Sequence, residues 1–528
     1  MSFASRRSPV LSMKSMVCTS QPLASMAGHQ ILQAGGNAAD AAICIAAVLS
    51  VIEPYSTGLG GDAFALFYQA SHKRVLGING SGRSGARCNL EFAQNKLGKT
   101  GEIPPQHGLS VTVPGTVQCW IDMLDKWGSK SLGEVLQPAI QLASDGFPVP
   151  ERTQYYWKKD VDDGRVDVNS VFAPGPQFPG EVMYNREMAH ILRLIVQEGR
   201  DGFYSGNVAK QICQAVNDRG GALDLQDLAE HRSEFCEPVK MRFQGVDVYE
   251  CPPNGQGMVA LMALDAFTKM GGSLLPRDSA EMINLQIECL RTSFTDAKRF
   301  VADPNFHKFD PYQLLLDDKL VEDRLERIRN GQQQGTPKQT CDTVSFQVVD
   351  GWGNSVSMVN SIYTGFGSGI CPPGLGFSLQ NRGCNFSLDP QSVNRLEGGK
   401  RPYHTIIPGM ALENNELKLS FTGMGGFAQP QNHLQFLINL LVFGDNVQQA
   451  IDRPRFCLMG DGRVALEEGI PEPIANQLQQ TFGQQVYFVR GYDRSVVGRG
   501  QIIARDLKTG VLSGGSDGRA DGCAVPGM

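Results

Sequence analysis

The sequence predicts a globular α/β protein in which helices and strands are intermixed along the chain. Hydrophobic residues make up 41% of the 528 residues and glycine contributes 60, which is typical of a packed α/β protein. Apolar side chains recur at spacings of three and four over residues 279–301, which predicts a long helix. Residues 343–361 hold two runs with a period of two, which predicts a pair of strands. The length allows several domains or one large layered domain.

Composition and charge argue against nucleic-acid binding and against a membrane span. The net charge is −6 and the basic residues are scattered. No apolar run follows the basic N-terminus, so a secretory signal is not expected. Residues 38–52, the longest apolar run, include Asp40 and are too few to cross a bilayer. The 13 cysteines form no CxxC pair and no close cluster with histidine, which is typical of free thiols in a reducing compartment. We expect a soluble, cytoplasmic protein with no metal or other cofactor.

Glycines separate the first predicted elements. Residues 23–34 predict a short helix that ends at two glycines, and Asn37 is the predicted N-cap of a buried helix over residues 38–52. The glycine-rich stretch 57–61 then leads into a strand predicted over residues 63–68. A phosphate-binding loop needs the order strand, loop, helix, and here that order is reversed. The stretch is therefore interpreted as a packing turn.

Helical and strand patterns continue to the end of the chain. Helices are predicted over residues 116–127, 132–144, 188–198, 207–219, 320–329, 430–443, 447–452 and 473–482. Strands are predicted over residues 75–79, 239–251, 406–412, 417–421, 485–489 and 501–506, and the last of these closes the chain. Residues 150–185 give no clear pattern. The polar stretch 330–339 is expected to be an exposed loop that ends at the strand pair.

Two polar residues outside the strand pair each allow two interpretations. Arg83 lies in the glycine-rich loop 80–85, where an arginine is usually solvated but can also bind a substrate carboxylate. His404 is more typical of a structural histidine than of a ligand-binding one.

The strand pair carries two hydroxyl groups on its polar side. Thr343, Ser345 and Gln347 alternate with apolar residues, which predicts a half-buried strand. If residues 351–353 form the connecting loop, Ser361 lies directly opposite Thr343. A loop that differs by one residue places Asn360 there instead. Two facing hydroxyls can support catalysis, or they can form a cross-strand pair that only stabilises the sheet.

Short motifs along nearly the whole chain occur in a characteristic order. They are AGGNAADAA (34–42), TGLGGDAF (57–64), VPGTV (113–117), DTVSFQVVDGWGNSVS (342–357), FGSGI (366–370), GMGG (423–426) and SDGRADG (516–522). In sequence and order they resemble the γ-glutamyltransferase (glutathione hydrolase) family of N-terminal nucleophile hydrolases. The resemblance implies a four-layer αββα sandwich that is made as one inactive precursor.

The resemblance also implies where the precursor is cut and which residues act. Cleavage between Asp342 and Thr343 gives a large subunit, residues 1–342, and a small subunit, residues 343–528, which together form one catalytic unit. Thr343 then supplies both the nucleophilic hydroxyl and, as its freed α-amine, the base. An α-amine titrates at about 7.7–8.0, close to the ideal for a base at neutral pH. Cys341 would break the family's spacing and is the weaker candidate for the nucleophile.

The family's other catalytic groups match further positions of this chain. Ser361 matches the second hydroxyl, which hydrogen-bonds the nucleophile. Gly425 and Gly426 match the paired glycines whose N–H groups form the oxyanion hole.

The substrate pocket departs from that of the family's best-known members. The positions that hold a γ-glutamyl group there correspond here to Ser81 or nearby Arg83, and to Tyr363, Arg382, Asn385, His404 and Thr405. An aspartate that would bind the donor's ammonium group is lost, while Arg382 adds a cation. The pocket is therefore expected to suit an anionic acyl group without a free amine. A shortened lid segment, residues 386–401, and the motif YHTIIPG (403–409) resemble a divergent branch with glutathione hydrolase-like proteins, cephalosporin acylases and oxamate amidohydrolase.

The expected function is cleavage of a γ-glutamyl or related amide through an acyl-enzyme on Thr343, as in glutathione hydrolysis or γ-glutamyl transfer. Water or an amino-acid amine would accept the acyl group. One alternative is an amidohydrolase for a non-glutamyl acyl group, and another is an unprocessed, non-catalytic relative. A nucleotide-binding enzyme has little support. The expected assembly is a heterodimer of the two subunits, which in turn could pair as a homodimer of heterodimers.

Overall fold

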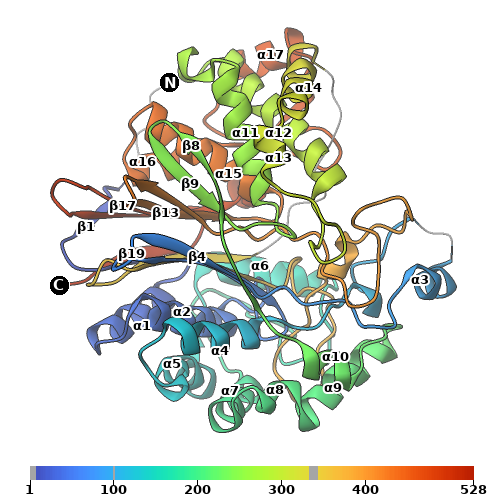
Figure 1. Cartoon of the computed structure of the whole chain (residues 1–528). Coiled ribbons are helices and arrows are strands. Elements are labelled where there is room, and N and C mark those ends of the chain that lie inside the picture. Colours follow the sequence, from blue (N-terminus) through green and yellow to red (C-terminus); the bar gives the residue numbers. More distant parts are fainter. Residues whose placement is uncertain (1–6, 99–100, 332–342) are drawn as a thin grey trace.

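Two antiparallel sheets lie face to face and helices cover both outer faces, so the protein has four layers (Figure 1). The computed structural model describes residues 7–98, 101–331 and 343–528. In the described part of the chain each large sheet has seven strands. This architecture confirms the αββα sandwich that the resemblance implied.

The first sheet contains the strand pair on which the sequence analysis centred. Its strands, in spatial order, are β19 (Cys523–Pro526), β2 (Met16–Thr19), β10 (Val344–Val349), β11 (Ser355–Ser361), β3 (Asp62–Gln69), β4 (Arg74–Asn79) and β7 (Glu234–Cys236). Its outer face is covered by α1 (Pro22–Gln33), α2 (Ala38–Ile52) and α4 (Thr116–Trp127), with α5 (Leu132–Asp145) packed on α2. The β10–β11 hairpin therefore lies near the centre of its sheet.

The second sheet carries the opposite wall of the interior. Its strands, in spatial order, are β1 (Val10–Ser12), β18 (Leu512–Ser516), β17 (Arg499–Arg505), β13 (Glu416–Met424), β12 (Gly409–Glu413), β9 (Val246–Glu250) and β8 (Val239–Phe243). Its outer helices are α11 (Gly257–Lys269), α15 (Ala428–Leu437) and α16 (Val447–Asp452), and α12 (Ala280–Phe300) packs on α11. Strand β13 crosses β10 and β11, so the two sheets meet at the hairpin.

The remaining elements surround the sandwich. The helices are α3 (Leu90–Leu97), α6 (Glu151–Asp162), α7 (Arg186–Glu198), α8 (Asp201–Tyr204), α9 (Gly206–Asp218), α10 (Leu225–Glu230), α13 (Gln313–Leu316), α14 (Asp318–Arg329) and α17 (Glu472–Gln480). The short strands β14 (Phe456–Leu458), β15 (Val464–Glu467) and β16 (Val486–Val489) form a small sheet, and β5 (Phe147–Pro148) pairs with β6 (Val182–Met183).

Helix α2 forms the centre of the core outside the first sheet. All its residues are buried, and Asn37 caps it as predicted, in a capping box with Asp40. The glycine turn before β3 is a packing turn, as interpreted. A side chain on Gly61 would approach the carbonyl oxygen of Ser361 to 2.5 Å, so only glycine lets this turn lie against β11.

The expectation of a half-buried β10 is wrong, because both faces of this strand are buried. Its apolar side packs against α2, and its polar side faces the second sheet. There the Gln347 side chain accepts a hydrogen bond of 2.5 Å from Ser420, and Ser357 of β11 donates to the Phe421 carbonyl. Some polar groups of one sheet thus bond to the other sheet, so the alternation did not indicate solvent.

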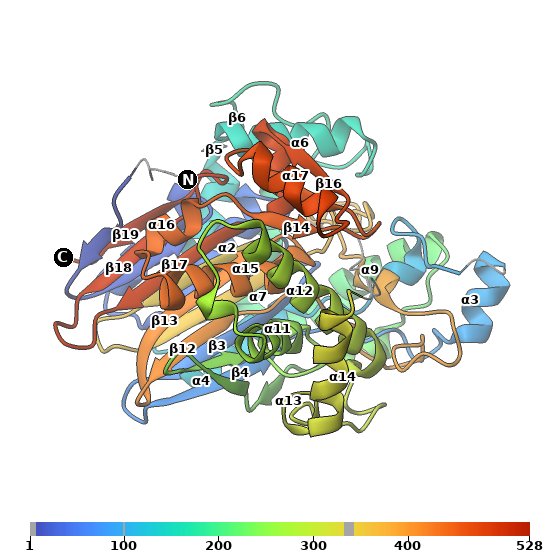
Figure 2. The same cartoon turned by 90° about the horizontal axis from the view of Figure 1, so that it is seen from above.

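The chain's last strands were missed from the sequence. Strands β18 and β19 follow residue 506, where the last strand was expected, and they pair with β1 and β2 (Figure 2). These segments are short and β18 contains two glycines, so they carry little strand signal. Helix α6 lies within residues 150–185, which gave no pattern. The strand expected over 406–412 begins only at Gly409.

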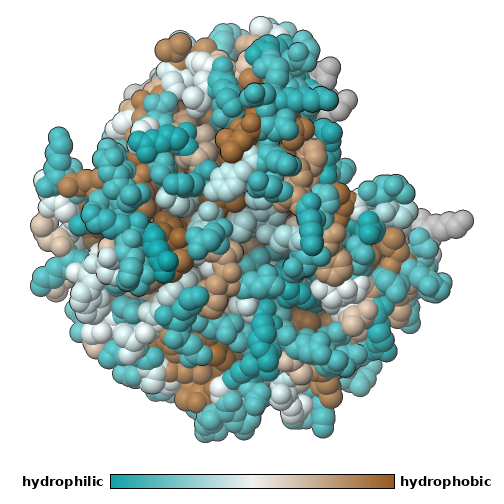
Figure 3. Space-filling view, viewed as in Figure 1, coloured by the Kyte–Doolittle hydropathy of each residue, from teal (hydrophilic) through white to brown (hydrophobic). Residues whose placement is uncertain are grey.

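The surface view in Figure 3 is mainly hydrophilic, with apolar residues in small separate patches. None of the helices in the described ranges is long and apolar enough to span a bilayer. The cysteines that the structure describes are all free thiols, and most of them are buried.

Candidate functional site

The β10–β11 hairpin brings Thr343 and Ser361 together. Val344 pairs with Asn360 and Ser345 with Val359, a register that places Thr343 opposite Ser361, as predicted from the three-residue loop. Their hydroxyl oxygens are 3.1 Å apart, and both residues are buried. The alternative register with Asn360 opposite Thr343 is excluded. Asn360 points elsewhere and donates to the Thr57 hydroxyl.

Arg382 supplies a buried positive charge beside this hydroxyl pair. It begins a short helical turn, Arg382–Asn385, and is 0% exposed. One terminal nitrogen (Nη2) donates to Ser361 Oγ at 3.1 Å, and the other (Nη1) donates to Thr405 Oγ1 at 2.5 Å. Its guanidinium carbon lies 4.3 Å from the centre of the Tyr363 ring, a cation–π contact. A buried guanidinium needs such partners, and it favours an anionic ligand.

Tyr363 links the hydroxyl pair to Asn385. Its backbone N–H donates to Ser361 Oγ at 2.9 Å, and its phenol donates to the side-chain oxygen of Asn385 at 2.8 Å. Tyr363 has φ of +83°, which is rare for a side chain with a Cβ and is characteristic of constrained sites. Ser361 Oγ therefore receives two hydrogen bonds, from Arg382 and Tyr363, and its own proton can be donated to Thr343.

His404 faces Asp62, a residue that sequence reasoning missed. Its Nε2 is 3.0 Å from Asp62 Oδ2, and its ring packs on Phe64 at 4.6 Å between centres. Burial, aided by the charge of Arg382, lowers the pKa of His404 to about 4. The ring is therefore neutral at pH 7, with Nδ1 accepting from the Ile406 N–H and Nε2 donating to Asp62. Asp62 pairs with Ser361 across β3 and β11, which fixes His404 near the site.

Arg83 lies on a different ion-pair cluster. It is bound to Glu234 at 2.6 Å, and Glu234 also binds the buried Arg401 at 2.6 Å. No contact among the described residues joins Arg83 to Thr343 or Ser361. Of the positions predicted for substrate binding, Tyr363, Arg382, Asn385 and Thr405 form one connected group, and His404 adjoins it in sequence and through Asp62.

Gly425 and Gly426 form the turn between β13 and α15. Their φ angles are +118° and +57°, which favour glycine. Neither of their N–H groups donates a hydrogen bond to any residue within the described ranges. Two unengaged N–H groups before a helix N-terminus are suited to bind an oxyanion.

Gln256 connects this glycine turn to Thr405 through hydrogen bonds. Its side-chain nitrogen donates to the Thr405 carbonyl at 2.7 Å and to the Gly426 carbonyl at 3.0 Å. Gln256 is fully buried. Gln256 did not stand out in the sequence, because its partners are remote along the chain and no local pattern marks it. Asp62 lies within the motif TGLGGDAF, but its partner His404 is remote along the chain, so its role was missed.

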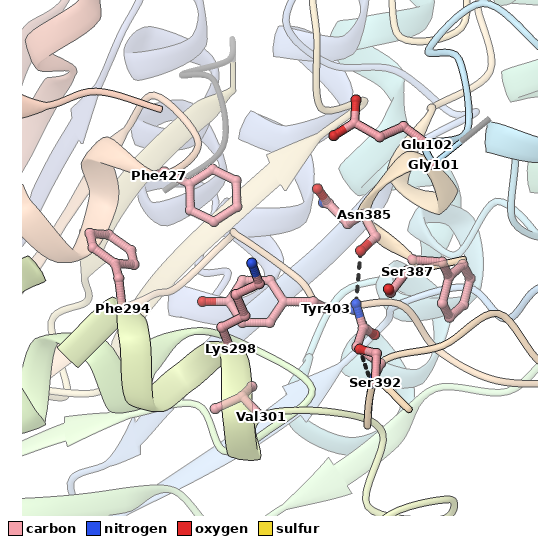
Figure 4. Close-up of a pocket in the computed structure, with 12 residues that line it drawn as sticks. Gly101, Glu102, Phe294, Lys298, Val301, Asn385, Ser387, Ser392, Tyr403 and Phe427 are labelled. Carbon is pink, nitrogen blue, oxygen red and sulfur yellow. Dashed lines mark hydrogen bonds between the residues drawn. The ribbon is translucent and has the colours of Figure 1, made fainter. Parts of the chain in front are cut away.

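A cavity of about 290 Å³ adjoins the site (Figure 4). Asn385 and Phe427, the residue after Gly426, both line it. Of the two residues at the predicted cleavage site, the structure describes Thr343. Asp342 lies outside the described residues.

Comparisons with known proteins identify the family of this chain. The sequence profile of the family described as gamma-glutamyltranspeptidase matches residues 24–527. A glutathione hydrolase-like YwrD proenzyme of Bacillus subtilis is 34% identical, covering 98% of this chain and 99% of its own length. An oxamate amidohydrolase proenzyme of Klebsiella pneumoniae is 30% identical, covering 95% and 96%. The crystal structure of a cephalosporin acylase from Bacillus halodurans superposes with a TM-score of 0.91 at 40% identity, covering 100% and 98%. The chain therefore belongs to the gamma-glutamyltranspeptidase family.

Proposed function

We propose that this protein is an autoprocessed amidohydrolase that cleaves an amide through an acyl-enzyme on Thr343. The observation that carries the proposal is the 3.1 Å contact between the Thr343 and Ser361 hydroxyls, at the position that the sequence resemblance assigns to the nucleophile. The buried Arg382, which donates to Ser361, and the open N–H groups of Gly425 and Gly426 supply the charge and the donors that acyl transfer needs.

The reaction follows from these groups. The Thr343 oxygen attacks the substrate's carbonyl carbon, and its proton passes to the α-amine of the same residue. Ser361 donates a hydrogen bond to the attacking oxygen. The N–H groups of Gly425 and Gly426 bind the oxyanion, where one donor typically contributes about 3–4 kcal/mol at the transition state.

The second half of the reaction releases the acyl group. The carbon–nitrogen bond breaks, and the leaving amine takes the proton held by the α-amine. Water then attacks the ester, with the α-amine again as the base, and the carboxylic acid leaves. An amino-acid amine in place of water would give transfer instead of hydrolysis.

The acyl group that this site suits is anionic and carries no free amine. Arg382 is a fixed cation in hydrogen-bond contact with Ser361, and Asn385 is neutral where an ammonium group would need a carboxylate. Tyr363 and Thr405 hold Arg382 in place, and His404 remains neutral beside them. Arg83 is given no direct contact with the substrate in this proposal, since Glu234 neutralises it.

Glutathione hydrolysis or γ-glutamyl transfer is the second candidate. It is favoured by the family profile and by the glutathione hydrolase-like relative that covers nearly the whole chain. Arg382 would bind the α-carboxylate of a γ-glutamyl group, but Asn385, at the position that faces the ammonium group in the family's best-known members, is neutral.

Processing would cut the chain between Asp342 and Thr343, because only a free α-amine can serve as the base. The products, residues 1–342 and 343–528, would remain one unit, since β10 and β11 of the small subunit lie between β2 and β3 of the large one. The proposal includes a homodimer of these heterodimers and a cytoplasmic location, for which the free thiols are suited.

Mass spectrometry of the purified protein tests the proposal together with an amide screen. We expect a fragment that begins at Thr343, and hydrolysis of anilides of small dicarboxylic acids faster than of the γ-glutamyl anilide. An intact chain without activity on any amide would refute the proposal.

A further inference from the structure

The cavity beside the site adjoins residues connected to the hydroxyl pair and to the glycine turn. Asn385 lines the cavity and accepts the hydrogen bond of Tyr363, whose N–H binds Ser361. Phe427, which also lines it, directly follows the glycine turn. A group that starts on Thr343 and passes Asn385 therefore enters this cavity.

Aromatic side chains form much of the cavity wall. Phe294 of α12, Tyr403 and Phe427 converge there, with the Tyr403 and Phe427 rings nearly parallel at 5.9 Å and Phe294 6.1 Å from Phe427. All three are at most 8% exposed. An apolar cavity of about 150 Å³ suffices to hold benzene. The volume of about 290 Å³ therefore has room for a substituted aromatic ring.

One buried polar group inside the cavity lacks a partner. Asn385 is 5% exposed, and its side-chain nitrogen donates to no described residue. Figure 4 shows its amide pointing across the cavity toward Phe427. A buried donor without a partner is costly. The side-chain nitrogen of Asn385 is therefore a donor that a polar group of a bound ligand can use.

The rim of the cavity carries one cation and one anion. Lys298 follows Phe294 by one helical turn, is exposed, and makes no ion pair with a described residue. Glu102 lines the rim on the Asn385 side (Figure 4). The two charges lie at different ends, so an acidic group is favoured at the Lys298 end.

We infer that this cavity binds the outer part of the acyl group, and that the substrate is an amide of an arylalkanoic acid whose ring carries an acidic substituent. The inference rests on the proposed function, because it assumes that Thr343 is acylated. It adds the size and shape of the acyl group, which the Arg382 contacts alone do not define. The carbonyl lies at Thr343, the chain passes Asn385, the ring packs against the wall formed by Phe294 and Phe427, and the acid reaches Lys298.

Three para-nitroanilides with the same leaving group test this assignment. They carry a glutaryl group, a phenylbutanoyl group and a carboxyphenylbutanoyl group. We expect kcat/KM to be highest for the carboxyphenylbutanoyl compound, about tenfold above the glutaryl one. The assignment is overturned if neither aromatic compound exceeds the glutaryl compound.

Substitutions in α12 distinguish the contribution of the cavity to kcat/KM from that of the rest of the site. Phe294→Trp fills the cavity and should lower kcat/KM for both aromatic compounds about tenfold, with the glutaryl compound unchanged. Phe300→Trp is the matched control, since Phe300 stacks on Phe309 and does not line the cavity. Lys298→Gln should lower only the carboxyphenylbutanoyl rate, about threefold, and the neighbouring Arg299→Gln should lower none. Equal loss on all three compounds in Phe294→Trp would overturn the inference.

A second series distinguishes the acyl group from the leaving group. With a glutaryl group held constant and the amine enlarged, Phe294→Trp should have no effect. An effect that follows the size of the amine would assign the cavity to the leaving group and overturn the inference.

Binding of free carboxyphenylbutanoic acid, measured by calorimetry, separates failure of the inference from failure of the proposed function. If no anilide is hydrolysed, the proposed function fails. Binding that Phe294→Trp abolishes and Phe300→Trp preserves would still support the cavity assignment, and absence of binding would overturn it.

Discussion

The hydroxyl oxygen of Thr343 lies 3.1 Å from that of Ser361, and Ser361 is itself held by Arg382 and by the Tyr363 N–H. Ser361, which orients the Thr343 hydroxyl, is thus held in position by two hydrogen bonds of its own.

Removal of the Thr343 hydroxyl should abolish both processing and hydrolysis. Thr343→Ala is expected to lower the hydrolysis rate about a thousandfold or more, because the acyl-enzyme cannot form. Gel electrophoresis, intact mass and anilide hydrolysis measure the two effects. Ser345→Ala is the matched control, since it removes another buried hydroxyl from the same face of β10. Processing at the normal rate in Thr343→Ala would contradict the assignment.

Loss of the Ser361 hydroxyl should slow acylation without preventing it. Ser361→Ala removes the donor to Thr343, and we expect kcat to fall about tenfold to a hundredfold. Stopped-flow measurement of the first turnover separates this step from deacylation. An unchanged first turnover would show that Ser361 has only a structural role.

Arg382 should select for the charge of the acyl group. Arg382→Gln is expected to lower kcat/KM for a short anionic acyl anilide, such as the glutaryl compound, by about 2 kcal/mol, or thirtyfold, because a charged hydrogen bond is lost. A neutral acyl anilide should be affected much less. Arg395→Gln serves as the control, since Arg395 pairs with Glu397 and is 41% exposed. Equal loss on charged and neutral substrates would argue against charge selection.

A side chain on the glycine turn should impair the oxyanion site. Gly425 has φ of +118°, and a Cβ there would lie 3.1 Å from the Gly498 Cα, so Gly425→Ala must shift the turn. We expect kcat to fall about a hundredfold. Gly444→Ala is the control for backbone strain alone, because Gly444 has φ of +70° with open space around it. Comparable activity loss in both variants would mean that the turn has no special role.

Stability should fall in mild acid because of His404. Its pKa is about 4 in the folded protein and 6.5 ordinarily, so between these values the unfolded chain binds more protons. The free energy of unfolding is therefore expected to decrease by about 3 kcal/mol as the pH falls through this window. Urea unfolding at several pH values measures the slope. His404→Gln should reduce that slope, and replacement of the exposed His72 by Gln should leave it unchanged.

Much of the fold was predictable because its signals are local. Helix α2, its Asn37 cap and the β10–β11 register follow from apolar spacing, capping and loop length, all of which act over a few residues. The terminal strands β18 and β19 were not predictable, because their stability comes from pairing with β1 and β2 at the other end of the chain.

The sequence by itself narrowed the residue opposite Thr343 to Ser361 or Asn360 and, through motif order, determined the family. Only the tertiary structure decided that β10 is buried on both faces, that Arg382 contacts Ser361, and that Asp62 and Gln256 support the site. The physical reason is distance along the chain. A hairpin register is set by its own loop, whereas the charge, the hydrogen-bond partners and the cavity around Thr343 come from segments that meet only when the two sheets stack.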